Sequence, residues 1–240
     1  VVVDCTGDGD IFHRAGEDYS LMKYNIGLVH RLGNIDRIDK TKPGYKEMPI
    51  GDPTPIPSVN WVNMGGEKDQ NGLDLYTLSE LQRKYRIQIW ESARRIRSTP
   101  GYEEVYLLDT APQLGVRMSR ILRGEYTLTL ADSMTYRTFD DVIGISGAWT
   151  TVEYNGQKIS PKNRPLWQIP YRSLLPKKTR NLLVPVRCFS FEAKLVEDAR
   201  IIGSCLVTGQ AAGAAAAVIV QTNAKARDVD VKKVQQLLRT

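Results

Sequence analysis

The sequence predicts a mixed α/β fold, α+β overall, in which the two ends of the chain build one domain and the middle builds another. Apolar runs of strand length stand near each end, at residues 1–3 and 182–184. An alanine-rich run at residues 211–220 follows the second of them and favours a buried helix, because Ala is the best helix former. The middle of the chain has short, loosely alternating segments bounded by turn residues, which is typical of antiparallel strands.

Composition and charge describe an ordinary soluble globular protein. The 240 residues are 42% hydrophobic and 25% charged, with a formal net charge of +6. This mild excess suits an anionic cofactor or substrate, and a solvated surface explains it equally well. The densest basic cluster is Arg94, Arg95 and Arg97, and no aromatic residue lies among them. We therefore expect no nucleic-acid partner.

Cysteine and histidine usage argues against metal or disulfide chemistry. Cys5, Cys188 and Cys205 are far apart and form no CxxC pair, and their odd number disfavours a disulfide framework. Two histidines do not make a metal site on their own, so no metal is expected. The longest apolar run, residues 211–220, is shorter than the ~20 residues of a membrane span. No signal peptide is visible, and the compartment stays open with the cytoplasm favoured.

The glycine-rich turn after the first strand is a candidate binding site. Gly7 and Gly9 permit tight backbone geometry and close approach to a ligand. Ligands of open α/β sheets lie outside the carboxyl ends of the strands, where this turn is expected. A plain Gly/Asp turn into a helix near Asp10 explains the same residues, so both interpretations stay open. A calcium loop is excluded, because the later ligands and the terminal Glu are missing.

The alanine-rich helix is expected to begin near Gly209 and Gln210. Small residues in a first helical turn leave N–H groups exposed, and such a helix start favours negative charge. A packed helix that binds nothing is the alternative.

Helical periodicity is clearest in the middle of the chain. Apolar residues recur at helical spacing at Leu81, Tyr85, Ile89, Ala93 and Ile96. Thr77 and Glu80 match a capping box, and Pro100 ends the helix. A strand is expected over residues 59–64, a hairpin turn at residues 155–156, and a last helix over residues 228–240 with Asp230 as its cap.

Four ordered blocks resemble the FAD-dependent oxidoreductase family related to the glutathione-reductase-type flavoproteins. They are VVVDCTGDGDIFHRAG at the start, LGVRMSRILRGEYTLTLAD in the middle, YRSLLP at residues 171–176, and Arg187-Cys188 followed by TGQAAGAAAA. The resemblance implies a partial FAD-binding Rossmann-like domain made of residues 1–18 and 166–240. It also implies an inserted antiparallel-sheet substrate or cap domain over residues 19–165.

The resemblance also implies site residues. Cofactor-binding positions would be Thr6, Gly7, Asp8, Arg187, Gly209, Gln210, Ala211 and Ala212. The N–H groups of the last three would face the pyrimidine edge of the flavin. The candidates for catalysis are Arg117, Tyr171 and Arg172. Val186 stands where the family has a glycine.

The Gly-x-Gly-x-x-Gly turn that holds the FAD pyrophosphate in such proteins is absent from these 240 residues. We therefore expect FAD to bind only with an upstream nucleotide-binding segment, from the same polypeptide or from a partner chain. The expected function is an FAD-dependent oxidoreductase acting on a small organic substrate, present here as a C-terminal portion. The alternative is a non-catalytic relative that keeps the fold as an assembly module without bound FAD.

Overall fold

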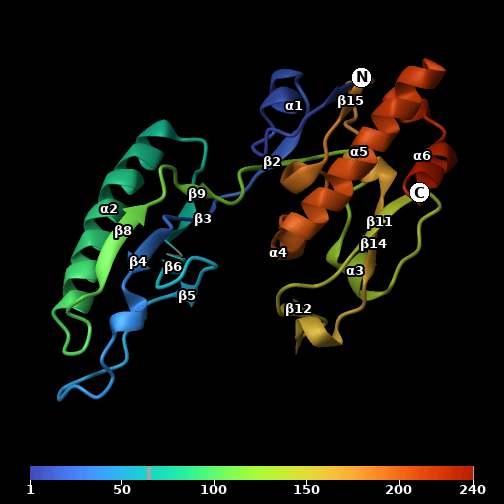
Figure 1. Cartoon of the computed structure of the whole chain (residues 1–240). Coiled ribbons are helices and arrows are strands. Elements are labelled where there is room, and N and C mark those ends of the chain that lie inside the picture. The colour runs from blue at the N-terminus through green and yellow to red at the C-terminus, as the bar shows by residue number, and fades with distance from the viewer. Residues whose placement is uncertain (64–65, 240) are drawn as a thin grey trace. The chain divides into compact units, whose positions relative to one another are not determined.

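The protein has a mixed α+β fold, as the sequence predicts, and divides into two compact units (Figure 1). The computed structural model describes residues 1–63 and 66–239. Unit 1 combines residues 1–22 with the chain from residue 118 onward, and unit 2 is residues 23–117. The two ends of the chain meet in unit 1, where β1 (Val2–Val3) pairs in parallel with β15 (Leu182–Leu183).

The unit boundaries differ from the expected division at residues 19 and 165. Residues 118–165 lie with the chain ends, because their strands pair there. β10 (Arg120–Leu122) is antiparallel to β2 (Tyr19–Leu21), and β11 (Val142–Ser146) is antiparallel to β14 (Trp167–Pro170). These pairings connect the middle of the chain to both of its ends, which no local pattern reveals.

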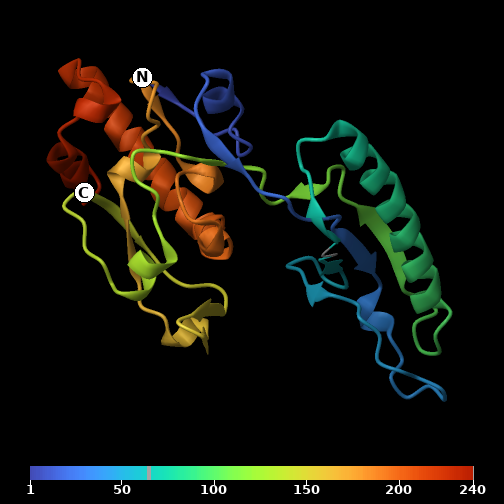
Figure 2. The ribbon, with the colours of Figure 1, turned by 180° about the vertical axis from the view of Figure 1, so that it is seen from behind.

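Unit 2 places one long helix over antiparallel strands (Figure 1 and Figure 2). A three-stranded sheet has the order β7-β3-β9 and a four-stranded sheet the order β5-β6-β4-β8. The elements are β3 (Tyr24–Gly27), β4 (His30–Gly33), β5 (Asp52–Pro53), β6 (Asn60–Val62), β7 (Glu67–Gln70), α2 (Leu75–Arg97), β8 (Tyr106–Thr110) and β9 (Gly115–Val116). The strand expected over residues 59–64 is thus β6, and residue 64 lies outside the described residues.

The buried face of helix α2 is the one that its apolar periodicity predicts. Its five buried residues are Leu81, Tyr85, Ile89, Ala93 and Ile96, the set expected from the sequence. They pack on Ile26 of β3, Leu32 of β4, and Leu28 in the link between these strands. The predicted capping box is wrong, because the helix begins one turn earlier, where the Asp74 side chain accepts a hydrogen bond from the Tyr76 N–H.

Unit 1 contains the remaining elements. Its other strands are β12 (Val152–Tyr154) and β13 (Gln157–Ile159), and its helices are α1 (Asp10–Arg14), α3 (Leu130–Met134), α4 (Val196–Ala199), α5 (Ile202–Thr222) and α6 (Val231–Leu237). The Asn155-Gly156 turn joins β12 to β13, as predicted for this hairpin. Asp230 caps α6, also as predicted, by accepting a hydrogen bond from the Lys232 N–H.

Helix α5 begins at Ile202, so the predicted start near Gly209 is wrong. The segment before Gly209 contains no proline, and its one glycine, Gly203, lies in the first turn, where the Cys205 N–H already donates to the Ile201 carbonyl at 3.0 Å. One face is buried and includes Ala211 and Ala212. The length and apolar composition of α5 would allow it to cross a membrane, which residues 211–220 alone would not. The helix is 39% buried, and its buried side contacts β11 and β1.

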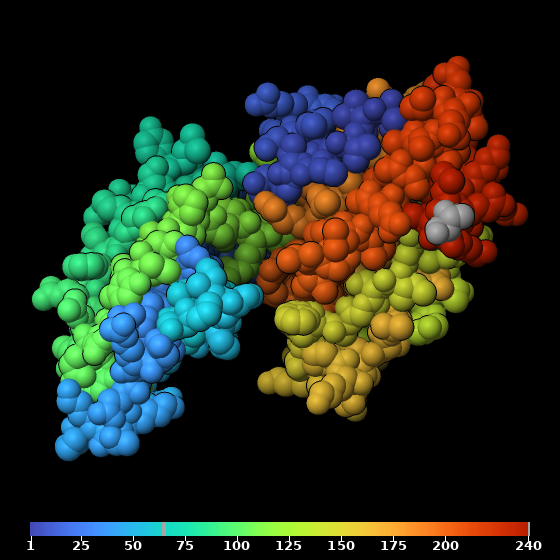
Figure 3. All heavy atoms as spheres, viewed as in Figure 1, coloured from blue at the N-terminus to red at the C-terminus, as the bar shows by residue number. Residues whose placement is uncertain are grey.

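The other face of α5 is exposed and has large apolar side chains at both ends, with Gln210 between them. Figure 3 shows α5 at the surface of unit 1. Ile202 is 80% exposed, Leu206 68% and Val220 71%. No charged residue occurs between Ile202 and Thr222. An exposed face of this kind usually marks a contact surface.

Candidate functional site

A buried carboxylate fixes the turn that follows β1. Asp4 is fully buried, and its Oδ1 accepts hydrogen bonds from the Thr6 N–H at 3.0 Å and the Thr6 hydroxyl at 2.6 Å. Its Oδ2 accepts from the Phe12 N–H at 2.8 Å, which joins the turn to α1. The Thr6 hydroxyl oxygen in turn accepts from the Asp10 N–H at 2.8 Å. These bonds hold the backbone of residues 6–8 in one conformation at the carboxyl end of the strand.

Gly7 and Arg187 meet at this turn. Gly7 has a φ of 78°, in the left-handed region that favours glycine. A Cβ atom built on it would lie 2.6 Å from Nη1 of Arg187, so only a glycine lets the guanidinium rest against the backbone. The Arg187 Nη2 donates to Asp8 Oδ1 at 3.2 Å, and its buried Nε donates no hydrogen bond within the described residues.

A second arginine closes the other side of the turn. The Arg120 Nη1 donates to the Asp8 carbonyl at 2.8 Å and to Asp10 Oδ1 at 2.9 Å. The Ser119 hydroxyl donates to Asp8 Oδ1 at 2.5 Å. Arg120 is buried beneath these contacts, and its Nε has no hydrogen-bond partner in the described part of the chain. Asp8 therefore contacts the guanidiniums of both Arg120 and Arg187. Each guanidinium has an Nε–H without a hydrogen-bond partner in the described residues.

Val186, the residue before Arg187, has a strained backbone. Its φ of 61° is left-handed, which is a genuine outlier for a β-branched residue. Its N–H donates to the Thr208 hydroxyl of α5 at 3.0 Å, and that hydroxyl donates to the Ser204 carbonyl at 3.0 Å. Strain of this kind persists where surrounding contacts hold it, and it is most common at functional sites.

The structure brings together four of the eight predicted cofactor positions. Thr6, Gly7 and Asp8 form the turn, and Arg187 lies on it. The other four, Gly209, Gln210, Ala211 and Ala212, lie inside α5. Their N–H groups are used by the helix itself, so they are not the free donors of a helix start. The first turn of α5 is instead formed by residues 202–204, and no side chain caps it.

The three catalytic candidates are divided between the two units. Tyr171 is buried, and its hydroxyl donates to the Ala226 carbonyl at 2.8 Å. Arg172 is half exposed and lies over the ring of Tyr126, beside Asp141. Arg117 belongs to unit 2, where it donates to Asn63 Oδ1 at 3.1 Å.

The cysteines are not poised for thiolate chemistry. Burial raises the pKa of Cys188 to about 12. Burial likewise raises the pKa of Cys5 and of Cys205 above the usual value. All three are free thiols, and the described residues contain no cluster of His, Cys, Asp or Glu able to hold a metal ion.

Sequence reasoning missed Asp4, Ser119 and Arg120 as parts of the site. Asp4 had a usable signal, since it is a carboxylate directly at the end of a buried strand. Arg120 and Ser119 stand within the block LGVRMSRILRGEYTLTLAD, but only the pairing of β10 with β2 brings them to the turn. Their contribution depends on a contact between residues more than a hundred positions apart.

Comparison with protein families gives one match along almost the whole chain. The model of the family described as FAD dependent oxidoreductase matches residues 1–238. A search of curated proteins and a search of solved structures each found no significant match.

Proposed function

Since this chain belongs to the FAD-dependent oxidoreductase family, whose cofactor is FAD, we propose that it supplies the part of a flavoenzyme that holds FAD beside the turn after β1. The match over residues 1–238 is the observation that carries the proposal. FAD supplies the redox chemistry when bound, and the protein positions it and tunes its surroundings. The substrate is proposed to be a small organic molecule.

The residues of the turn fit a flavin nucleotide. Gly7 lets the Arg187 guanidinium rest against the backbone of the turn, which places a permanent positive charge at the carboxyl end of β1. The buried Nε atoms of Arg120 and Arg187 are donors without partners in the described residues. Arg offers a planar, permanently charged fork suited to phosphate or to an anionic ring edge. We therefore assign Thr6, Gly7, Asp8 and Arg187 to cofactor binding.

In helix α5, the N–H groups of the first turn, and not those of residues 209–212, are proposed to face the cofactor. Ile202, Gly203 and Ser204 precede the first complete set of helical hydrogen bonds, and no side chain caps them. Their N–H groups and the positive end of the helix dipole favour negative charge. The Val186 N–H, next to Arg187, donates to the Thr208 hydroxyl of α5, so the start of α5 lies near the residues of the β1 turn.

Two of the three catalytic candidates are proposed to meet a substrate. Arg172 is half exposed on unit 1, and Arg117 belongs to unit 2, which we propose to be the substrate domain. Either guanidinium suits an anionic group on a substrate. Tyr171 is assigned a packing role, because its hydroxyl is buried and already donates to a carbonyl.

We propose further that an upstream nucleotide-binding segment covers unit 1. β1 and β15 form a sheet of two strands, whereas parallel sheets are normally larger and covered on both faces. Among the described residues, no strand pairs with the second edge of β1. The exposed apolar face of α5 belongs to a helix that contacts β1. A strand and a helix from such a segment would extend the sheet and bury this face, giving a Rossmann-like domain of glutathione-reductase type.

Co-expression tests the proposal. The 240 residues would be produced with a nucleotide-binding segment that carries the Gly-x-Gly-x-x-Gly turn, and flavin absorbance of the purified complex would be measured. We expect a yellow complex for the natural chain and loss of colour for Arg187→Ala. Leu206→Glu should prevent assembly without unfolding unit 1, because this side chain is exposed. A stable but colourless complex would favour the non-catalytic assembly module instead.

A further inference from the structure

Helix α2 has a second face with its own pattern, which we call the outer stripe. It consists of Tyr76, Arg83, Ile87, Trp90, Arg94 and Arg97. Successive members are seven, four, three, four and three residues apart, which follows the 3.6 residues of a helical turn. All six side chains therefore fall on one side of the helix. This side is opposite to the one that packs on the strands of unit 2. All six residues are exposed.

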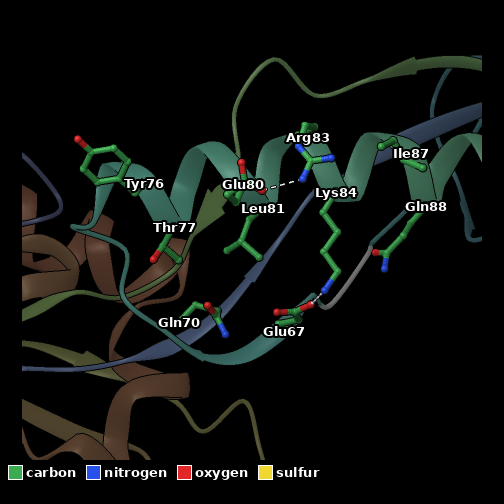
Figure 4. A pocket seen from close by; sticks show the side chains of 10 residues that line it. All are labelled: Glu67, Gln70, Tyr76, Thr77, Glu80, Leu81, Arg83, Lys84, Ile87 and Gln88. Atoms are coloured by element: carbon green, nitrogen blue, oxygen red, sulfur yellow. Dashed lines mark hydrogen bonds and ion pairs between the residues drawn. The ribbon is translucent and has the colours of Figure 1, made fainter.

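Helix α2 is strongly basic, and three of its arginines, Arg83, Arg94 and Arg97, belong to the outer stripe. Helix α2 has six basic and two acidic residues, a net +4 out of the +6 of the whole chain. Arg83 is paired with Glu80 at 2.7 Å, and Lys84 is paired with Glu67, both visible in Figure 4. Arg94 and Arg95 form no ion pair within the described residues. The unbalanced charge is therefore concentrated in the C-terminal half of the helix.

The helix dipole explains only part of this pattern. Basic residues in a last turn interact favourably with the negative end of the dipole, which accounts for the charge of Arg94, Arg95 and Arg97. It does not account for the apolar residues in the same line. Trp90 is 57% exposed and stands one turn before Arg94, with Ile87 beside it. Large exposed apolar side chains framed by cations indicate a contact surface.

We propose that the outer stripe of α2 docks unit 2 on the surface of an anionic membrane. Clusters of four to eight Lys and Arg residues on an amphipathic helix are typical of binding to anionic lipid. Trp and Tyr side chains prefer the level of the lipid headgroups. A hollow of about 560 Å³ is lined by Trp90 and by the three arginines of the last turn, together with Glu91 and Ser98. It can receive the phosphate of a headgroup against Arg94 and Arg97, with the Trp90 ring beside the glycerol.

A flat surface suits the outer stripe better than a folded protein does. A specific protein interface draws about 20–30 residues from each side, usually from several elements. The stripe has six residues on one convex helix. A plane meets such a helix along a line, and the long arginine side chains can reach the headgroups on both sides of Trp90.

Vesicle binding by the whole chain tests this proposal. The chain would be mixed with equimolar phosphatidylcholine and phosphatidylserine, and separately with phosphatidylcholine alone, and the bound fraction measured by sedimentation. We expect binding to the mixed vesicles only, and we expect it to weaken as salt is added. Arg94→Ala/Arg97→Ala should lower the partition coefficient about thirtyfold, which is about 2 kcal/mol at 1.4 kcal/mol per tenfold.

A matched control separates the stripe from net charge. Lys40→Ala/Lys46→Ala removes the same two charges from an exposed loop of unit 2 and should leave binding nearly unchanged. Brominated lipid should quench the natural chain, and Trp90→Phe should remove that quenching while Trp61, Trp149 and Trp167 remain. All three variants should have the melting temperature of the natural chain.

Three results would overturn the proposal. They are equal binding to both kinds of vesicle, an equal loss in the Lys40/Lys46 control, and quenching that survives Trp90→Phe. Polyglutamate that binds the outer stripe when no vesicle does would assign the surface to an acidic protein instead.

Discussion

The guanidinium of Arg187 rests against the α-carbon of Gly7, close enough that a Cβ atom there would lie 2.6 Å from Nη1. Residue 187 is thereby tied to the turn after the first strand, through Gly7 and through Asp8. Of the arginines that the structure describes, Arg187 alone both touches the turn and lies next to a strained residue, and this contact sets its position. It also gives a direct test of how the turn is held.

Gly7→Ala should destabilise unit 1 and displace Arg187. The left-handed backbone alone costs roughly 1–2 kcal/mol for a residue with a Cβ atom. Gly16→Ala is the matched control, since Gly16 has a φ of 80° but nothing within 4 Å of its Cβ position. In urea unfolding, only Gly7→Ala should couple to Arg187→Ala, by roughly 0.5–1 kcal/mol. Additive effects of Gly7→Ala and Arg187→Ala would show that the contact has no energetic weight.

Val186→Gly should be more stable than Val186→Ala by about 1 kcal/mol, because Ala keeps a Cβ atom in the left-handed region and Gly does not. The order is the reverse of that at an ordinary site. Gln88, exposed in the interior of α2, provides the comparison, and there Gly should be less stable than Ala by about 1 kcal/mol. The measurement is the free energy of unfolding of the four variants. The same order at both sites would mean that Val186 is not strained.

Asp132 should contribute stability that acid removes. Burial by itself raises the pKa of this carboxyl, but hydrogen bonds from the Tyr126 hydroxyl and from Thr129 outweigh it and hold the pKa below its usual value. A depressed pKa means that the contribution is present above about pH 4 and is lost as the pH falls through the folded-state pKa. Asp132→Asn should therefore be less stable than the natural chain near neutral pH, and the gap should shrink in acid. A gap that stays constant down to pH ~2 would contradict this, and exposed Asp140→Asn is the control.

These 240 residues alone should bind FAD weakly. The glycine turn that would hold the pyrophosphate is absent, and hydrogen bonds to charged groups contribute ~1.5–3 kcal/mol each. Losing two of them weakens binding by roughly two to four powers of ten. Titration followed by flavin fluorescence measures this, with the co-expressed complex as the reference. Tight stoichiometric binding to the chain alone would refute the prediction.

Elements held by a local pattern could be predicted from the sequence. The buried face of α2 follows from spacing alone, since Leu81, Tyr85 and Ile89 recur on one side whatever they pack against. The cap of α6 and the hairpin at Asn155 are equally local. The predicted start of α2 was wrong because Asp74 and Thr77 are both good caps, and Asp74 is the one that caps the helix. The Asp74 carboxylate also accepts a hydrogen bond from the Thr77 hydroxyl at 2.5 Å.

Elements defined by distant contacts could not be predicted. Helix α5 runs through Val207, whose side chain fills the place where a Cβ of Gly144 would stand. That contact holds the helix against β11 at a position N-terminal to Gly209. Neither residue belongs to a sequence pattern that predicts the contact. The same holds for the candidate site, where the turn was visible in the sequence but its partner Arg120 was not.

The parallel pairing of β1 with β15 has a consequence for synthesis on the ribosome. Val2 can pair with Leu182 only after about 180 further residues have emerged, which takes roughly 9–36 s at 5–20 residues per second. Unit 2 is contiguous in sequence and has its own apolar clusters, so it can fold during that wait. The first strand meanwhile presents a short valine run with no partner, a natural target for a holding chaperone until the second half of its domain arrives.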